Sequence, residues 1–373
     1  MILFKNIFLC FGTRPEAIKM APLYHELKKH GFKVRVCVTA QHREMLDQVL
    51  RFFKIVPDYD LNLMQPNQTL NELSAQILKR MDGVFNQEKP DLVLVHGDTT
   101  TSAMVALAAF HKKIKIGHIE AGLRTYNKNA PFPEEINRQI TARITDYHFA
   151  PTTLASSNLL AEKILSENII ITGNTVIDAL FLGLAKIDKN PQLIQPNIVE
   201  IFAAHSKVIL TTIHRRENFG EGLESICNAL QSISENQGVK ILIPLHLNPM
   251  VQEPVNRILG KNPNILLIEP LDYPNFIYAM SKSYLIMTDS GGVQEEAPSL
   301  GKPVLVLRDA TERPEAIDAG TVKLVGTDKK KIVEETNNLL NDKEYYSSFT
   351  KKSNPYGNGT ASETIVNFIK KLK

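Results

Sequence analysis

The sequence is poor in the features of secreted and membrane-spanning proteins. It has three cysteines and no tryptophan, and Cys10, Cys37 and Cys227 lie far apart in apolar segments without forming a CxxC pair. We therefore expect three reduced core cysteines in a cytoplasmic protein, because stable disulfides form in oxidising compartments. No apolar run reaches the roughly 18–20 residues that span a bilayer, so we expect no membrane segment. The absence of tryptophan excludes no function.

The sequence also lacks a large excess of positive or negative charge. The 43 lysines and arginines nearly balance the 40 acidic residues, and the net charge of +3 offers no broad basic surface for nucleic acid. The apolar N-terminal segment MILFKNIFLCFG lacks a basic leader and a small-residue cleavage site, so we do not expect a signal peptide. A chain of 373 residues exceeds one ordinary core, which predicts two domains.

Short apolar segments alternate with helical segments through both halves of the chain. This alternation predicts an α/β fold with two doubly wound, Rossmann-like domains, each built on a parallel sheet. We place a loop near 57–68 and the interdomain linker in the polar, proline-containing segment 186–195. Outside the segment 91–138, which holds two more strands, the predicted strands are 6–11, 33–39, 147–150, 169–172, 208–213, 240–245, 265–268, 284–288, 304–307 and 321–324.

Polar and ionisable residues follow the two strands predicted within 91–138. They are His96, Asp98, His118, Glu120, Arg124, Glu134 and Glu135. Ligands of open α/β sheets bind outside the carboxyl ends of the strands, so we predict a site here. Glu120 directly follows an apolar strand, where burial costs free energy unless the carboxylate has a partner, such as Arg124, or a function. Asp98 can instead cap a helix, and Glu134 and Glu135 suit a first helical turn.

The segment from Gly12 to Lys19 joins the first strand to a helix. Thr13 is a suitable N-cap and Pro15 suits the first helical position. The helix N-terminus and Arg14 together favour an anion, although a structural turn with an exposed arginine fits equally well. The segment matches neither GxGxxG nor a Walker A sequence, which disfavours a dinucleotide site or a P-loop.

Asp289–Glu296 is the strongest local signal in the second half. Ser290, Gly291 and Gly292 follow a strand and open a helix, so their backbone can approach a phosphate closely. Glu296 is placed to accept hydrogen bonds from a ribose diol, whereas the structural alternative is a glycine-rich turn with a solvated glutamate. His214 and His246 also follow strands, but they lack metal-ligand spacing such as HExxH. Arg308 and Arg313 lie beyond the next strand and could face the same anion.

Taken together, these motifs resemble those of one family. GTRPEAIKMAP, TAQHREMLDQVL, VHGDTTT, HIEAGLRT, FPEE, GNTVIDAL, HRRENFGEG, DSGGVQEEAP and ERPEA occur in the order found in the non-hydrolysing bacterial UDP-N-acetylglucosamine 2-epimerases. The resemblance spans nearly the whole chain. It implies a glycosyltransferase-B type fold, in which two Rossmann-like domains face a cleft that holds UDP. The implied domains are 1–173 with 356–373, which carries the catalytic carboxylates, and 174–355, which binds UDP.

The resemblance also implies functional residues and partners. Catalytic roles fall on Asp98, Glu120, Glu134 and His214. A second, activating UDP-GlcNAc site matches Gln41, Arg215 and His246, and a homodimer is implied as well. The expected UDP contacts are Arg14, Lys19, His214, Phe276, Ser290, Gly291, Gly292, Glu296 and Arg313.

The implied reaction explains this set of residues. Loss of UDP from C1 with removal of the C2 proton gives 2-acetamidoglucal, and return of a proton to the other face gives UDP-N-acetylmannosamine. This chemistry needs an acid/base pair and stabilisation of a diphosphate leaving group, and we expect no cofactor and no metal. Three alternatives stay open: a hydrolysing epimerase that releases ManNAc and UDP, a glycosyltransferase of the same fold, and a non-catalytic nucleotide-sugar sensor.

Overall fold

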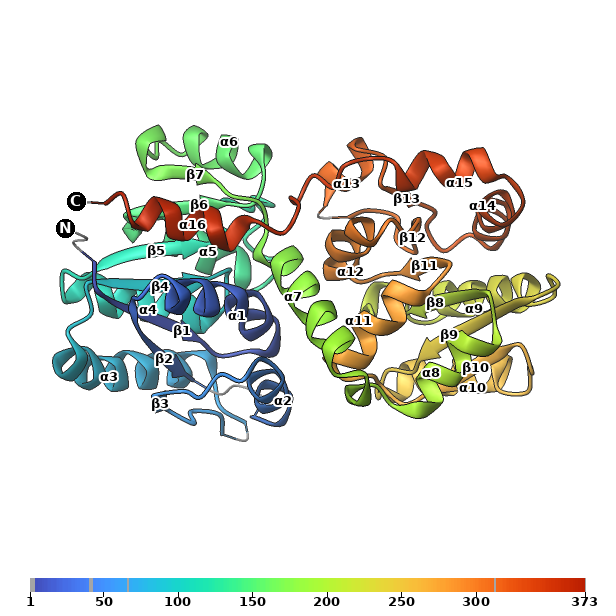
Figure 1. Ribbon diagram of the computed structural model, residues 1–373, viewed down its shortest axis with the longest axis horizontal. Coiled ribbons are helices and arrows are strands. Elements are labelled where there is room, and N and C mark those ends of the chain that lie inside the picture. Colours follow the sequence, from blue (N-terminus) through green and yellow to red (C-terminus); the bar gives the residue numbers. More distant parts are fainter. Residues whose placement is uncertain (1–3, 40–42, 66, 312, 373) are drawn as a thin grey trace. The chain divides into compact units, whose positions relative to one another are not determined.

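The computed structural model describes residues 4–39, 43–65, 67–311 and 313–372. The chain divides into two compact units, Met1–Leu182 with Tyr356–Lys373 as unit 1 and Gly183–Pro355 as unit 2 (Figure 1). Each unit contains one parallel sheet with helices packed against it, so the predicted fold class is confirmed. No helix in the described part of the chain has the length and apolar character needed to cross a membrane.

Unit 1 is organised around a sheet of order β3-β2-β1-β4-β5-β6-β7. The order reverses between β1 and β4, and such a switch point is where open α/β sheets bind ligands. The predicted strands are present, but the region near 57–68, predicted as a loop, contains the short strand β3, which pairs through its backbone with the end of β2. The strands are β1 (Asn6–Phe11), β2 (Lys33–Val38), β3 (Tyr59–Asp60), β4 (Leu92–His96), β5 (Lys115–Ile119), β6 (Tyr147–Ala150) and β7 (Ile169–Ile171).

The helices of unit 1 form two groups, with α1 beside α2 and α16, and α4 beside α3 and α5. Thr13 caps α1, as predicted, but α1 begins at Arg14, so Pro15 is its second residue and not its first. Glu16, which was not predicted to take part, completes a capping box with Thr13. A short 3-10 helix, Ser166–Asn168, precedes β7. The helices are α1 (Arg14–Lys29), α2 (Arg43–Phe53), α3 (Leu70–Glu88), α4 (Thr100–His111), α5 (Glu134–Ile144), α6 (Thr153–Ala161) and α16 (Ala361–Ile369). Helix α7 (Thr175–Lys189) begins in unit 1 and ends in unit 2, because the division falls between Leu182 and Gly183.

The last helix, α16, belongs to unit 1 although unit 2 separates it from the rest of that unit in the sequence. The Asp178 carboxylate accepts hydrogen bonds from the backbone N–H groups of Ala361 (3.2 Å) and Ser362 (2.7 Å) and so caps α16. The ring of Phe368 packs edge-on against Tyr147 and Phe149 of β6. Helix α16 therefore completes the core of unit 1.

Unit 2 has a second parallel sheet, of order β10-β9-β8-β11-β12-β13. Its strands begin or end within one residue of the predicted bounds. The predicted linker 186–195 is largely helical, because Lys186–Lys189 continue α7 and Pro191–Leu193 form a 3-10 turn. The strands are β8 (Lys207–Thr212), β9 (Val239–Pro244), β10 (Ile265–Ile268), β11 (Leu285–Thr288), β12 (Val304–Val306) and β13 (Val322–Leu324).

A hydrophobic core of unit 2 lies between its sheet and α9, α10, α14 and α15. Cys227 lies in this core, and Cys10 and Cys37 lie in that of unit 1; all three are free and buried, as predicted. The helices are α8 (Pro196–Ala204), α9 (Glu221–Ile233), α10 (Pro249–Leu259), α11 (Tyr273–Lys282), α12 (Gly291–Glu296), α13 (Pro314–Asp318), α14 (Lys329–Asn341) and α15 (Lys343–Thr350), with 3-10 turns Arg216–Asn218 and Ala297–Leu300.

Candidate functional site

The carboxyl ends of β4 and β5 bring Asp98 and Glu120 to one edge of the unit 1 sheet. The two strands pair in register from Leu92 with Lys115 onwards, and the pairing continues where the N–H of Gly97 donates to the carbonyl of Ile119 (2.9 Å). Glu120 has a φ of +62°, a left-handed conformation that costs a non-glycine residue about 1 kcal/mol or more. The chain therefore turns sharply at the first residue after β5.

Glu120 is held by basic and amide side chains from other elements. Its side chain is 8% exposed, and its Oε2 atom forms an ion pair with Lys19 of α1. The same oxygen accepts a hydrogen bond from Asn174 Nδ2 (2.8 Å), and His96 Nε2 lies 3.8 Å away. Lys19, expected at the nucleotide, thus contacts a predicted catalytic carboxylate. Asn174 was not predicted, although it lies in the GNTVIDAL motif.

The structure rejects an ion pair between Glu120 and Arg124 as the explanation for Glu120. The guanidinium of Arg124 is buried and donates instead to Glu162 of the loop after α6, from Nε at 2.6 Å and from Nη2 at 2.9 Å. Arg124 also donates to the carbonyl of Leu123. This pair ties the loop after β5 to α6 and has a structural role.

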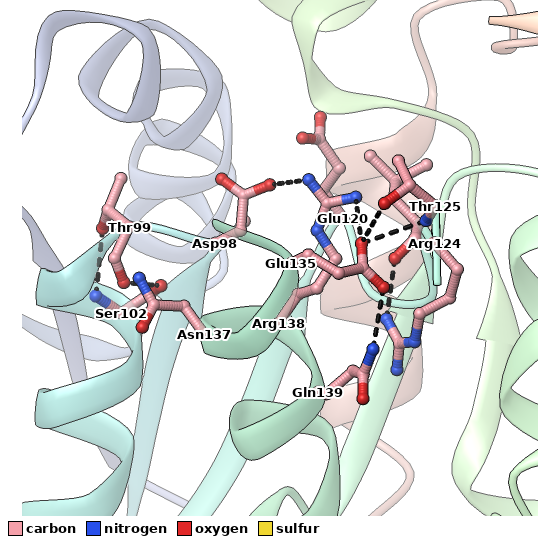
Figure 2. Close-up of polar contacts among 12 residues, drawn as sticks. Asp98, Thr99, Ser102, Glu120, Arg124, Thr125, Glu135, Asn137, Arg138 and Gln139 are labelled. Carbon is pink, nitrogen blue, oxygen red and sulfur yellow. Dashed lines mark hydrogen bonds and ion pairs between the residues drawn. The ribbon is translucent and has the colours of Figure 1, made fainter. Parts of the chain in front are cut away.

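Asp98 forms an ion pair with Arg138 of α5, whose Nη2 lies 2.5 Å from Asp98 Oδ2 (Figure 2). Burial raises the pKa of Asp98, and Arg138 opposes that rise while nearby Glu120 adds to it. The alternative that Asp98 caps α4 is wrong, because the cap is Thr99, whose hydroxyl accepts from the N–H of Ser102 (3.1 Å). Arg138 was not singled out from the sequence.

Glu135 and Glu134 have different environments at the start of α5. Glu135 is fully buried and accepts hydrogen bonds from the N–H groups of Thr125 and Tyr126, both at 3.0 Å, and from Gln139 Nε2 at 2.8 Å (Figure 2). Burial acts to raise its pKa, but these donors outweigh it and hold the pKa below the ordinary value. Glu134 is half-buried and makes no hydrogen bond or ion pair with any described residue.

The buried histidines of unit 1 are uncharged at neutral pH. His118 donates from Nε2 to the carbonyl of Gly97 (2.7 Å), and burial lowers its pKa to about 3. His118 is thus a hydrogen-bonded structural residue. Burial lowers the pKa of His96 to about 4, and neither ring nitrogen of His96 makes a hydrogen bond within the described residues.

The start of α1 is built around a buried glutamate. Glu16 accepts hydrogen bonds from the N–H groups of Gly12 (3.0 Å) and Thr13 (2.8 Å), and from the hydroxyl of Thr99 (2.7 Å). Burial raises the pKa of Glu16, and the bond from Thr99 opposes that rise. Glu16 therefore ties the first turn of α1 to that of α4. Arg14, a predicted UDP contact, is the first residue of α1.

In unit 2, Asp289 orients His214. Asp289 is fully buried, and its Oδ2 accepts from the N–H groups of His214 (2.9 Å) and Arg215 (2.8 Å), while Asn218 Nδ2 lies 3.2 Å away. His214 Nδ1 lies 3.0 Å from Asp289 Oδ1. Burial raises the pKa of Asp289, but the contacts with His214 outweigh it and hold the pKa below the ordinary value. Nδ1 of His214 is thus engaged, which leaves Nε2 for a ligand.

The predicted phosphate cradle lies between β11 and α12. A Cβ atom on Gly291 would lie 3.7 Å from Arg215 Nη2, so this guanidinium lies over the turn. Arg313 forms an ion pair with Glu295, and the guanidinium of Arg308 is paired with Glu217. Both cations predicted to face the anion are therefore neutralised by carboxylates of the same unit.

The other predicted residues of unit 2 lie in varied surroundings. Glu296 is the last residue of α12 and is buried, and Phe276 is half-buried in α11. His246 stacks on His214, with ring centroids 5.9 Å apart. Gln41, predicted for the second site with Arg215 and His246, lies outside the described residues. Over the described ranges, no group of three or more His, Cys, Asp or Glu side chains is arranged to hold a metal ion.

Known proteins match this chain over almost its full length. The family model described as UDP-N-acetylglucosamine 2-epimerase matches residues 25–370. UDP-N-acetylglucosamine 2-epimerase of Salmonella typhimurium is 54% identical over 373 residues, 99% of each chain. The crystal structure of UDP-GlcNAc 2-epimerase from Neisseria meningitidis bound to UDP-GlcNAc is 52% identical, with a TM-score of 0.89 over 98% of this chain and 100% of that one. An S. aureus MnaA–UDP structure is 50% identical, with a TM-score of 0.86 over 98% and 96%. The chain therefore belongs to the UDP-N-acetylglucosamine 2-epimerase family.

Proposed function

We propose that this protein is an isomerase that interconverts UDP-N-acetylglucosamine and UDP-N-acetylmannosamine by inversion at C2. Family membership supports this activity, and the relatives from Neisseria meningitidis and S. aureus were solved with UDP-GlcNAc and UDP, respectively. The observation that carries the proposal is the placement of Asp98 and Glu120, with buried charged partners, at one sheet edge beside the start of α5. A protein that only bound a nucleotide sugar would not need these carboxylates.

In the proposed reaction, a carboxylate removes the proton from C2. The C–H electron pair forms the C1=C2 double bond, and the C1–O bond breaks with its electron pair on the UDP oxygen. A carboxylic acid on the other face then returns a proton to C2, and UDP adds back to C1. We assign the acid and base roles to Asp98, Glu120 and Glu134 as a set. Glu134 suits this set because its carboxylate makes no bond within the described part of the protein.

The diphosphate needs positive groups as it leaves C1. We assign this role in unit 2 to His214, oriented by Asp289, and to the backbone of Ser290, Gly291 and Gly292. Glu296 and Phe276 complete the assigned nucleoside contacts of unit 2, and Arg14 of α1 is retained as a diphosphate contact. Lys19 and Arg313 already pair with Glu120 and Glu295, so we expect them to contact UDP through their remaining donors.

The finer properties of the enzyme are part of the same proposal. The GTRPEAIK and HRREN segments favour the non-hydrolysing reaction over release of ManNAc and UDP. We assign the carboxylates to a domain of residues 1–173 and 356–373 and UDP binding to residues 174–355. An activating UDP-GlcNAc site at Gln41, Arg215 and His246, a homodimer, a cytoplasmic location and a supply of UDP-ManNAc for surface glycans complete the proposal.

Incubation with UDP-GlcNAc in deuterated water tests the function directly. The proposal predicts UDP-ManNAc with deuterium at C2, observed by proton NMR as loss of the H2 signal in both sugars. Free ManNAc with UDP would instead identify a hydrolysing enzyme. A chain that binds UDP-GlcNAc without any exchange at C2 would be a sensor, and the proposed activity would be wrong.

A further inference from the structure

Arg138 lies between two carboxylates of different elements. Its side chain is 9% exposed, and it approaches Asp98 through Nη2 at 2.5 Å and Glu135 through Nη1 at 3.4 Å (Figure 2). The Nε atom of Arg138 is buried and makes no hydrogen bond within the described residues. The guanidinium is therefore committed to these two carboxylates and is almost shielded from water.

The two carboxylates differ in their access to solvent and in their bonds. Glu135 is fully buried, and its oxygens accept bonds from the backbone of Thr125 and Tyr126. The Asp98 side chain is 26% exposed, and within the described residues Arg138 is its one hydrogen-bonding partner, through Oδ2. Glu135 is thus an anchor that fixes Arg138, whereas Asp98 keeps Oδ1 for a substrate.

From this arrangement we propose that Arg138 is a positioning residue, which holds Asp98 in one orientation and in its ionised form so that Oδ1 can accept the proton from C2. The inference rests on the proposed function, since it needs Asp98 to take part in proton transfer. Glu135 is part of the same device: it fixes the guanidinium from the opposite side and ties it to the loop that precedes α5.

The charges around Asp98 explain why it needs such a partner. The charged groups that face Asp98 are Arg138 from α5, Glu120 directly after β5 and Lys19 from α1. Lys19 is paired with Glu120, so these two charges largely cancel, and Arg138 supplies the remaining positive charge next to Asp98. Without Arg138, burial and the Glu120 carboxylate would both favour the protonated acid, which cannot accept a proton.

The test uses the full-length protein and C2 deuterium exchange, measured as kcat and KM for UDP-GlcNAc between pH 5.5 and 9.5. Arg138→Met, Asp98→Asn and the double variant form a cycle, and Arg138→Lys keeps the charge. The matched control is Arg143→Met, because Arg143 lies on the same helix but is exposed and contacts the carbonyl of Glu162. Circular dichroism and thermal unfolding verify that each variant is folded.

We expect Arg138→Met to lower kcat about 10²–10³-fold near neutral pH and to change KM less than about threefold. The acid limb of its kcat profile moves to higher pH by about one unit or more, so activity partly returns in base. Arg138→Lys restores part of the rate. The double variant is no slower than Asp98→Asn alone, because both changes remove one function. Arg143→Met behaves like the wild type.

Three results would overturn the inference: losses that multiply in the double variant, an unmoved acid limb, or a raised KM with unchanged kcat. If Arg138→Met does not fold, the same cycle with Arg138→Lys and Asp98→Asn decides between shared and separate functions. A wild-type protein without C2 exchange would refute the proposed function itself, which is a different outcome from an active enzyme that is indifferent to Arg138.

Discussion

Lys19 and Glu120 form an ion pair that joins the second turn of α1 to the residue directly after β5. The two residues are 101 positions apart in the sequence, and both side chains are largely shielded from water. An attractive pair of this kind is expensive to break, because removal of one partner leaves an uncompensated buried charge. Substitution of either Lys19 or Glu120 should therefore impair the function of both residues.

Glu120→Gln should retain UDP binding and lose most turnover, about 10²–10⁴-fold in kcat, because an amide cannot exchange the C2 proton. Lys19→Met should also lower kcat, since Glu120 then loses the positive charge that lies next to its Oε2 atom. Isothermal titration with UDP and the C2 exchange assay measure the two effects. Lys29→Met, an exposed position in the last turn of α1, is the control. If Glu120→Gln kept full turnover, the ion pair of Lys19 and Glu120 would have a structural role only.

Substitution of Glu134 should mainly affect turnover, whereas substitution of Glu135 should mainly affect stability. Glu135→Gln should lower the free energy of unfolding by about 1.5–3 kcal/mol, because bonds to a buried ionised acceptor are lost. Glu134→Gln should change stability by less than about 0.5 kcal/mol, since its carboxylate makes no bond to the described residues, yet should reduce turnover strongly. Urea unfolding and the exchange assay on both variants test this. Equal effects on stability would contradict the distinction.

The stability of unit 1 should fall as the pH decreases from about 6.5 towards 4. Burial lowers the pKa values of His96, His118 and His148 to about 4, 3 and 4. In this window the unfolded chain binds protons that the folded chain excludes, so each histidine removes up to about 1.4 kcal/mol per pH unit. Urea unfolding between pH 7 and 5 measures the slope. If the ring signals of His96 in NMR spectra titrated near pH 6.5, the predicted loss of stability would be refuted.

Asp289→Asn should weaken UDP binding about tenfold. The amide offers one acceptor oxygen in place of two, so it cannot serve the backbone of His214 and Arg215 and also the ring of His214. The imidazole then loses the 3.0 Å contact between its Nδ1 and Asp289 Oδ1, which fixes its orientation. Titration calorimetry with UDP measures the change, with Asp318→Asn, an exposed position in α13, as the control. Unchanged affinity would show that His214 needs no such support.

The architecture was largely predictable because it rests on local patterns. Continuous apolar runs predict buried parallel strands, and Thr13 with Glu16 marks the start of α1. Strand β3 was missed because its two residues carry no apolar pattern and pair only through their backbone. The helical structure within 186–195 was missed because a polar composition suits an exposed helix as well as a linker.

The site was predictable in part. Asp98 and Glu120 could be selected because both follow apolar strands, a position that depends only on the order of residues. Their partners could not be selected, since Arg124 lies near Glu120 in the sequence but reaches Glu162, while Lys19 comes from another element. Glu134 and Glu135 are neighbours of one type, and only the folded loop before α5 distinguishes their surroundings.

The bonds between Asp178 and the start of α16 have a consequence for biosynthesis. The ribosome synthesises residues 1–182 well before α16, the helix that packs on β6. The core of unit 1 therefore stays incomplete while unit 2 is being synthesised. Unit 2 is one uninterrupted stretch and can fold as it emerges. The nascent chain should therefore complete its first unit only after the second unit has been synthesised and α16 has emerged.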